Sequence, residues 1–420
     1  MKYFLPLKVN FNWIKFEIHR IKQIPSPILI FKIGLRLIGL TVGIVLLPLT
    51  LFLHLVGYRH VTVFTDRIGH LALELDCLIK EQQLGLITAR KWLILAPPNR
   101  VANKHLLSYW QPFVHVISNR VICFLVASMS RWGLMRFNID RYVRATYKVQ
   151  AAYGINAKWA HRSPILSLTS EDQKWGADRL LELGLPERAW FVCVHAREGG
   201  YSPIDEQLHI HRNCRIENTI SAMQEIINRG GWVIRIGDPS MQRLVPMDKV
   251  IDYAHHPLKS ERLDIILCAM SRFILGNTSG ISLVGTVFGV PCALANMVPL
   301  AALGVGNRDI SIPKLYWSLN EYRYLTFMEV FTSKASQYQY NSEFVQMGLV
   351  PVENSLDEIK ELAIDMMKRH GDYPSSKQSD VNLSDQFISM LGPNHYSYGA
   401  SSCVSESFLK RHLSLLIQHE

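Results

Sequence analysis

Residues 170–295 alternate between apolar runs typical of strands and amphipathic runs typical of helices, and this alternation constrains the fold more than any other feature. Strands are predicted at 189–195, 232–236, 250–253, 273–275 and 292–295. Helices are predicted at 170–183, 217–228, 263–270 and 281–288, the first beginning at a capping box, Ser170 to Gln173. Strands separated by helices of this length form right-handed βαβ units, so the sequence predicts a parallel sheet covered by helices.

A weaker copy of this pattern lies nearer the N-terminus. HVTVFTD at 60–66 predicts a strand, and after a glycine turn a helix begins at Leu71. Further strands are predicted at 91–96 and 113–118. A capping box at 355–358 predicts a helix that runs to Gly371, and SESFLKRHLSLLIQ at 405–418 predicts one more.

The length of 420 residues is enough for two ordinary hydrophobic cores. We therefore predict an α/β protein with two Rossmann-like lobes and parallel sheets. The N-terminal lobe is expected at 58–165 and the C-terminal lobe at 166–371. Residues 1–57 form a separate N-terminal segment, and residues 372–420 form a loop and a returning helix.

The N-terminal segment combines a basic arm with an apolar stretch. Up to Arg36 the chain carries seven Lys and Arg side chains against one carboxylate, Glu17. Residues 37–56 are uncharged apart from His54 and are about long enough to cross a bilayer. A basic arm alone is compatible with nucleic-acid binding, but a basic flank before an apolar segment indicates the cytoplasmic, anionic membrane face instead.

Three interpretations of this apolar stretch compete. A cleaved signal peptide is disfavoured, because the arm is long and no A-x-A-like site precedes the next strand. A buried core helix is the second interpretation, and a membrane-associated helix is the one we favour. Pro48 leaves open a kinked or re-entrant insertion as well as a straight transmembrane helix.

Polar side chains follow three predicted strands of the C-terminal lobe. His195, Arg197 and Glu198 follow the strand at 189–195 and enter a loop that contains glycine. An Arg in this position can bind a phosphate or carboxylate through two parallel hydrogen bonds. The alternative is an ion pair between this Arg and a neighbouring acid.

The next strand carries Arg235 and ends at Asp238. A charge inside an apolar strand is costly unless it is paired. Arg235 is therefore expected either to contact a ligand or to pair with a buried acid such as Asp252. Asp238 lies in a sharp turn, where its carboxylate can accept a hydrogen bond from a sugar hydroxyl.

The third strand ends in GNTSG at 276–280, directly before a helix. The backbone amides from Asn277 to Gly280 and the hydroxyls of Thr278 and Ser279 are expected to converge near the positive end of the helix. Such a turn suits a phosphate or pyrophosphate. The alternative is an ordinary Asn or Ser N-cap with no ligand.

Several better-defined motifs are absent. The sequence contains no P-loop, dinucleotide-binding, zincin or nucleophile-elbow signature. It also contains no D-x-D pair to hold Mg²⁺ or Mn²⁺, so we expect no metal and no cofactor. Seven cysteines without a C-x-x-C lie mostly in apolar runs, which indicates buried thiols in a reducing compartment.

The span 191–369 resembles a family of bacterial GT-B glycosyltransferases from surface-polysaccharide clusters. The resemblance rests on VCVHAREGGY, HRNCRIENTISAMQEIINRGGWVIRIGDPSM, VIDYAHHP, LDIILCAMSRFILGNTSGISLVGTVFGVPCALAN and ISIPKLYW, with a weaker match in TDRIGHL at 65–71. His-x-Arg at 195–197 is also similar to the loop of fucosyltransferase-type enzymes whose Arg binds the β-phosphate of the donor. This sequence has Glu198 where that motif has a second Arg.

The resemblance implies a GT-B fold with a nucleotide-sugar held mainly on the C-terminal lobe, without a metal. Arg197 would contact the donor phosphate and stabilise the leaving diphosphate. His70 is the candidate base for the acceptor hydroxyl, with Asp66 as its rival. By analogy with acidic residues late in GT-B C-terminal lobes, Glu329 is expected to reach donor hydroxyls.

The sequence thus predicts a metal-independent glycosyltransferase that acts on a glycan or a lipid-linked acceptor in surface-polysaccharide synthesis. The alternatives are a nucleotide-sugar 2-epimerase-like enzyme and a non-catalytic nucleotide- or sugar-binding subunit of an assembly complex. We expect a membrane partner, no nucleic acid, and a location at the cytoplasmic face of the inner membrane. A straight span behind a cytoplasmic arm would place the lobes outside, so either the segment re-enters at Pro48 or this is a type II protein of a secretory lumen. We favour re-entrant insertion, because the odd number of cysteines in apolar runs indicates a reducing compartment.

Overall fold

The computed structural model describes residues 26–142, 150–200, 203–369 and 382–416. The chain divides into two compact units. Unit 1 comprises residues 1–62, 90–98 and 115–137, and unit 2 comprises residues 63–89, 99–114 and 138–420. The domain ranges expected from the sequence stay a prediction.

Unit 2 is built on a seven-stranded sheet in which each pair of neighbouring strands is parallel, as predicted. Its central strands are β5 (Phe191–Val194), β6 (Trp232–Arg235), β8 (Ile274–Gly276) and β9 (Cys292–Met297). β7 (Val250–Ile251), β10 (Ile310–Pro313) and β14 (Cys403–Val404) complete it. The order is β14-β10-β9-β8-β5-β6-β7. Without β14 this is the doubly wound order 3-2-1-4-5-6, read from β7 to β10.

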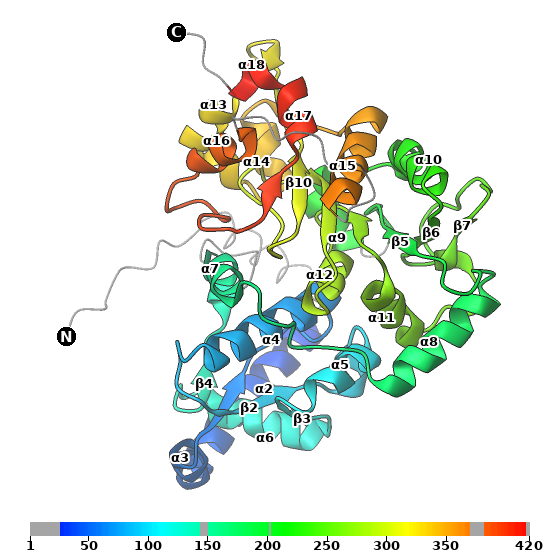
Figure 1. Ribbon diagram of the computed structural model, residues 1–420. Helices are drawn as coiled ribbons and strands as arrows, with labels where there is room; N and C mark the ends of the chain where they lie inside the picture. Colours follow the sequence, from blue (N-terminus) through cyan, green and yellow to red (C-terminus); the bar gives the residue numbers. More distant parts are fainter. Residues whose placement is uncertain (1–25, 143–149, 201–202, 370–381, 417–420) are drawn as a thin grey trace. The chain divides into compact units, whose positions relative to one another are not determined.

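The helices of this sheet confirm the predicted alternation. α10 (Ile220–Asn228) and α15 (Leu356–Arg369) contact each other, whereas α11 (Glu261–Met270) contacts α8 (Ser170–Glu182) and α12 (Gly280–Val287). Figure 1 shows these two groups on opposite sides of β5 and β6. The central strands are therefore covered on both faces, which explains their apolar sequences.

Two predicted helix starts have different outcomes. α8 begins at the N-cap Thr169, whose side chain accepts from the Asp172 N–H, so the predicted capping box at 170–173 is wrong by one residue. The second capping box is present, because Ser355 and Glu358 exchange side-chain-to-backbone hydrogen bonds of 2.7 and 3.3 Å. Gly371, the predicted end of α15, lies outside the described residues.

The remaining elements of unit 2 lie outside the seven-stranded sheet. An antiparallel sheet that the pattern did not predict has the order β12 (Arg323–Tyr324), β11 (Leu315–Ser318), β13 (Leu349–Val352). The predicted C-terminal helix is divided into α17 (Glu406–Arg411) and α18 (Leu413–Leu416). The other helices are α4 (Ile68–Gln83), α5 (Lys104–Trp110), α7 (Gln150–Trp159), α9 (Pro203–His209), α13 (Phe327–Thr332), α14 (Asn341–Gln346) and α16 (Leu383–Ser389).

Unit 1 contains a four-stranded parallel sheet of order β3-β2-β1-β4. β2 (Lys91–Leu95) and β3 (His115–Ile117) confirm the predicted strands. β1 (Tyr58–Val61) begins earlier than predicted and ends at Val61, and β4 (Arg136–Phe137) was not predicted. The core of unit 1 joins Leu93 of β2 to Val126 and Met129 of α6 (Arg120–Ser130).

The apolar N-terminal stretch forms two helices, α2 (Ser26–Val45) and α3 (Leu47–Leu55). Within the described residues no single helix is long and apolar enough to cross a membrane. Residues 33–45 of α2 and all of α3 would suffice together, but they are bent by 65°. Pro48 lies in the first turn of α3 and cannot continue the hydrogen bonding of a preceding helix, which explains why the break occurs at Leu46.

Candidate functional site

The sheet order of unit 2 changes direction between β5 and β8. These strands are neighbours, with Cys193 paired to Ile274 and Val194 to Leu275. Just beyond β5, the His195 N–H donates to the Leu275 carbonyl at 2.9 Å. In open α/β sheets, ligands bind outside the carboxyl ends of the strands where the order reverses. The loop of Arg197 and the 277–280 turn both begin at this point, so the two loops are neighbours.

Asn277 connects three backbone segments at this edge. Its side chain is 2% exposed. Its Oδ1 accepts from the Arg197 N–H at 3.2 Å, and its Nδ2 donates to the Arg212 carbonyl at 3.1 Å and to Cys214 Sγ at 3.2 Å. The Thr278 hydroxyl also points inward and accepts from the Val298 N–H at 3.2 Å. These two side chains therefore hold the turn in shape.

Ser279 and Gly280 are the N-cap and the first residue of α12. Ser279 has the extended backbone of an N-cap, with φ −134° and ψ 154°, but makes no side-chain capping hydrogen bond. Both residues are partly exposed. Ser279 is thus the N-cap residue of α12, but its hydroxyl does not neutralise the positive end of the helix.

Three cationic side chains lie around this turn; we call Arg197, Arg212 and Lys314 the cationic cluster. Arg212 Nη2 donates to the Thr278 carbonyl at 2.6 Å. Arg197 Nη1 donates to Asn213 Oδ1, and Lys314 Nζ donates to the Asn213 carbonyl at 2.7 Å. Burial lowers the pKa of Lys314, and the nearby Glu353 carboxylate opposes this. Arg212 and Lys314 were not predicted as site residues, although both lie in stretches that carry the family resemblance.

Two buried histidines belong to the same region. Burial lowers the pKa of His195 to about 4, so its imidazole is neutral near pH 7. His195 Nδ1 lies 3.1 Å from the Ile236 carbonyl and must carry the proton to donate to it. Burial, and then the charges of His209, Arg212 and Lys314, lower the pKa of His211 to about 3. Among the described residues, neither ring nitrogen of His211 has a hydrogen-bond partner.

Arg235 has the structural role that the sequence left open. Its side chain is fully buried and donates to Asp252 at 2.8 Å, to the Gln242 carbonyl at 2.8 Å and to Glu198 at 3.3 Å. Glu198 also accepts from the Gln242 N–H at 2.7 Å. Arg235 and Glu198 thus bind each other, and their predicted donor-binding role stays a prediction. Asp238 accepts from the Ser240 N–H at 2.9 Å and shapes its own turn.

Glu329 is likewise engaged locally. Its carboxylate accepts hydrogen bonds from both terminal guanidinium nitrogens of Arg323, Nη2 at 2.6 Å and Nη1 at 2.9 Å. It also closes a capping box with Thr326 at the start of α13. Hydrogen bonds from Arg323 lower the pKa of Glu329 to about 2. The predicted contact of Glu329 with donor hydroxyls therefore stays a prediction without structural support.

The predicted base, His70, lies in the first turn of α4 and contacts a buried acid. His70 Nδ1 is 2.5 Å from Glu74 Oε1, and the side chains are 31% and 1% exposed. Burial raises the pKa of Glu74, and the hydrogen bond to His70 partly offsets this. With Nδ1 bonded to the carboxylate, Nε2 can act as a base. The rival base Asp66 is exposed in the turn before α4. Glu74 was not predicted, although its i,i+4 spacing from His70 was a usable signal.

The first turns of α4 and α12 touch through two glycines. A Cβ added to Gly69 would lie 2.7 Å from Gly280 Cα, and one added to Gly280 would lie 2.9 Å from the Gly69 nitrogen. Only glycine at both positions permits this approach. The residue that follows Gly69 is His70, and the residue before Gly280 is Ser279, so the predicted base and the 277–280 turn meet at one contact.

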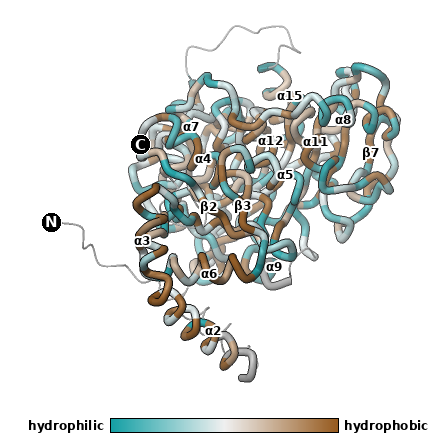
Figure 2. The backbone as a smooth tube through the Cα atoms, turned by 90° about the horizontal axis from the view of Figure 1, so that it is seen from below, coloured by the Kyte–Doolittle hydropathy of each residue, from teal (hydrophilic) through white to brown (hydrophobic). Residues whose placement is uncertain are grey.

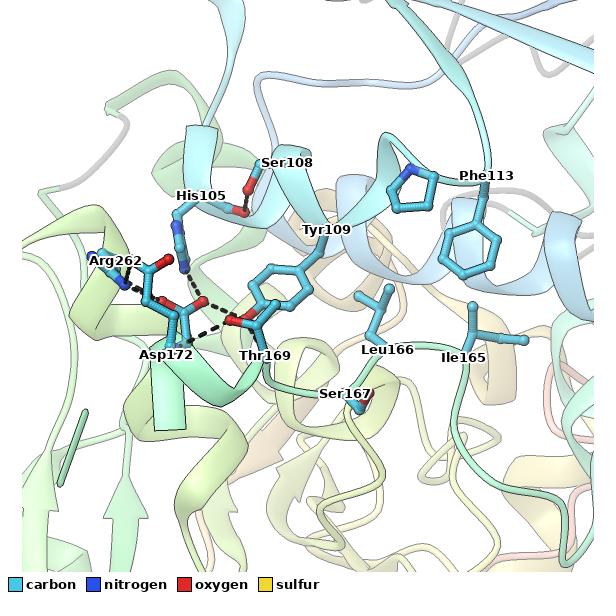
Figure 3. A pocket seen from close by; sticks show the side chains of 12 residues that line it. His105, Ser108, Tyr109, Phe113, Ile165, Leu166, Ser167, Thr169, Asp172 and Arg262 are labelled. Carbon is cyan, nitrogen blue, oxygen red and sulfur yellow. Dashed lines mark hydrogen bonds and ion pairs between the residues drawn. The ribbon is translucent and has the colours of Figure 1, made fainter. Parts of the chain in front are cut away.

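A separate cavity of about 530 Å³ lies in unit 2 at the other end of α12 (Figure 3). Tyr109 lines it and contacts Phe288, the C-cap of α12, with ring centroids 5.2 Å apart. Asp172 accepts from Tyr109, from His105 at 2.9 Å and from Arg262 at 2.7 Å. Burial opposes its charge, but these hydrogen bonds keep the pKa of Asp172 below its ordinary value. The Asp172 carboxylate thus has hydrogen-bond partners within the network, and no hydrogen bond seen among the described residues connects the network to the 277–280 turn.

Comparisons with known proteins give fold-level likenesses. No protein-family model and no curated protein matches the sequence. Among solved structures, a family 9 glycosyl transferase from Veillonella parvula DSM 2008 has a TM-score of 0.38 and 10% identity, covering 70% of this chain and 96% of that chain. The ADP-heptose lipopolysaccharide heptosyltransferase II of E. coli has a TM-score of 0.40 and 11% identity, covering 60% and 90%.

A third similar structure is the iron-containing dodecameric glycosyltransferase TibC of E. coli H10407, with a TM-score of 0.33 and 12% identity, covering 57% of this chain and 58% of that chain. Identities this low leave the function to be argued from the residues of this chain. No group of three or more His, Cys, Asp or Glu side chains in the described residues is arranged to hold a metal. Metal independence stays a prediction.

Proposed function

We propose that this chain is a GT-B glycosyltransferase that transfers a sugar from a nucleotide-sugar to a glycan or lipid-linked acceptor in surface-polysaccharide synthesis. The observation that carries the proposal is the contact of Gly69 with Gly280. It joins a His–Glu pair, suited to removing a proton, to a helix start suited to holding an anion. Glycosyl transfer from a nucleotide-sugar needs both groups within one site.

The donor diphosphate is assigned to the start of α12. The Ser279 N–H donates to the Asn277 carbonyl at 2.6 Å, so the diphosphate is assigned to the Gly280 N–H and the positive end of the helix, with positive potential from the cationic cluster. As the bond between the sugar carbon and the phosphate oxygen breaks, negative charge grows on the departing nucleoside diphosphate. Arg197 and Arg212 stabilise that charge. Of the predicted residues, Asn277 and Thr278 contribute by shaping the turn.

The acceptor proton is assigned to His70 Nε2. As the acceptor oxygen bonds to the sugar carbon, its hydrogen passes to the imidazole, and the Glu74 carboxylate balances the new positive charge. Glu74 is thus a positioning residue, because it acts through His70. Since only His70 of this pair is appreciably exposed, the acceptor approaches from its side.

A ligand screen tests this function. Thermal shifts of the full chain are measured with UDP-, GDP-, ADP- and CMP-sugars, with and without EDTA, followed by nucleoside diphosphate release with glycan and lipid-linked acceptors. We expect one nucleotide class to raise Tm in the presence of EDTA and release to require an acceptor. A changed sugar without an acceptor would indicate the epimerase, and binding without any product would indicate the non-catalytic subunit. No shift with any nucleotide would contradict the proposal.

A further inference from the structure

Unit 1 carries all of the excess positive charge of the chain. Its residues include 13 Lys and Arg side chains but one carboxylate, Glu17, out of 45 and 35 in the whole chain. Unit 2 therefore has 32 cations and 34 carboxylates, and the net charge of +10 becomes +12 on unit 1 and −2 on unit 2. The described residues of unit 1 contain no Asp or Glu. Such a body is attracted to anionic surfaces.

The same unit presents a large apolar surface. α3 is hydrophobic on all sides, yet Thr50 is its only buried residue, and Phe52 and Leu55 are 59% and 81% exposed. Figure 2 shows α3 and much of α2 and α6 in the colour of hydrophobic residues. On α6, which contacts both helices, Val121 and Ile122 are also exposed. A helix that is apolar all round is normally covered, either by a protein core or by lipid.

One face of the pair α2 and α3 packs against the rest of unit 1. Leu46, at the bend, and Leu53 of α3 pack against the unit 1 core. Gly43 of α2 approaches the Ser128 carbonyl and the Trp132 ring so closely that an added Cβ would lie 2.6 Å from each. The outward face is therefore held in place by packing, and it is the part available to a partner.

The charges along α2 argue against a straight span. Arg131 Nη1 donates to the Arg36 carbonyl at 3.3 Å, and a Cβ on Gly39 would lie 3.0 Å from the Arg131 guanidinium. Arg36 itself is exposed. These residues lie near the middle of a 20-residue helix, so a crossing orientation would place two guanidinium groups in the hydrocarbon core. The 65° bend between α2 and α3 fits an orientation in the membrane plane.

We propose that unit 1 docks on an anionic lipid bilayer, with α2, α3 and the start of α6 lying in the membrane plane at the boundary of headgroups and acyl chains. The apolar side chains enter the boundary, and the cations contact lipid phosphates. In this arrangement no helix crosses the bilayer. Because nothing in this docking uses His70 or the cationic cluster, it stands independently of glycosyl transfer.

Vesicle flotation of the full chain tests the docking. Vesicles of phosphatidylcholine alone are compared with vesicles that also contain phosphatidylglycerol, at low and high salt. We expect at least about tenfold tighter binding to the anionic vesicles, lost at high salt. The double variant Phe52→Ser, Leu55→Ser should weaken binding by about tenfold or more. Arg120→Gln, at the start of α6, should weaken binding by about fivefold.

The matched control is Val245→Ser in unit 2, a side chain that is 75% exposed and should leave binding unchanged. Equal binding to both vesicle types, or no effect of the double variant, would overturn the proposal and point to a protein partner. Acceptor-dependent nucleoside diphosphate release without vesicles reports the proposed function separately.

Protease digestion distinguishes in-plane docking from crossing. The full chain, tagged at both termini, is bound to preformed vesicles and treated with protease from outside. We expect both tags to be removed at equal rates. Protection of one tag until detergent is added would show that the helices cross and would overturn the in-plane arrangement.

Discussion

The contact between α4 and α12 makes Gly280→Ala the sharpest perturbation of the proposed site. The added Cβ would lie 2.9 Å from the Gly69 nitrogen and 3.1 Å from its Cα, where ordinary contacts begin at 3.4 Å. Both neighbours are backbone atoms, so the two helix starts must separate by about 0.5 Å, at a cost of about 1–3 kcal/mol for overpacking. Helix propensity returns up to about 1 kcal/mol, which leaves a small net loss of stability.

The effect on catalysis should be larger than the effect on stability. Because misplacement by about 1 Å can cost about a hundredfold in rate, a separation half as large should lower turnover about tenfold. Nucleoside diphosphate release and urea unfolding measure the two effects. The matched control is Gly154→Ala in α7, where an added Cβ meets nothing within 4 Å. Turnover of Gly280→Ala within about twofold of the unmodified protein would refute this reasoning.

Three further predictions concern single side chains. Glu74→Gln should lower kcat about tenfold or more at unchanged donor KM, because it acts on the base His70 and not on the donor; an equal rise in KM would contradict this. Burial depresses the pKa of His211 from 6.5 to about 3, so the unfolded chain binds more protons below pH 6.5 and stability is lost as the pH falls. Between pH 7 and pH 5 the unfolding free energy of the unmodified protein should therefore fall by up to about 2 kcal/mol more than that of His211→Phe. Urea titrations at the two pH values measure both changes. Arg235→Met should lower the unfolding free energy by about 3 kcal/mol and leave the donor Kd, measured by calorimetry, unchanged. A higher donor Kd would instead support a contact between Arg235 and the ligand.

The sequence was informative where a feature depends on local pattern. Apolar strands ending at Arg197 and at the GNTSG turn, each followed by a helix, predicted the parallel sheet and two of its loops. The strand pairing then required those loops to be neighbours. His70 was predicted as the base because it follows the first strand, and it lies in the first turn of α4.

Features that depend on distant contacts were not predictable. Arg212 reaches the turn at Thr278 across 66 residues, and Lys314 reaches Asn213 across 101. The inward direction of the Thr278 hydroxyl depends on the Val298 N–H beyond β9, which no local pattern encodes. The choice between the two roles of Arg235 likewise required seeing its contact with Asp252.

The central claim is that His70 and the 277–280 turn serve one reaction. The most direct measurement compares donor Kd and kcat for His70→Asn, with Asp66→Asn as the variant of the rival base. We predict that His70→Asn keeps the donor Kd within about twofold and lowers kcat by about 10²–10⁴, while Asp66→Asn changes neither. Retained turnover in His70→Asn, or a loss confined to Asp66→Asn, would contradict the account.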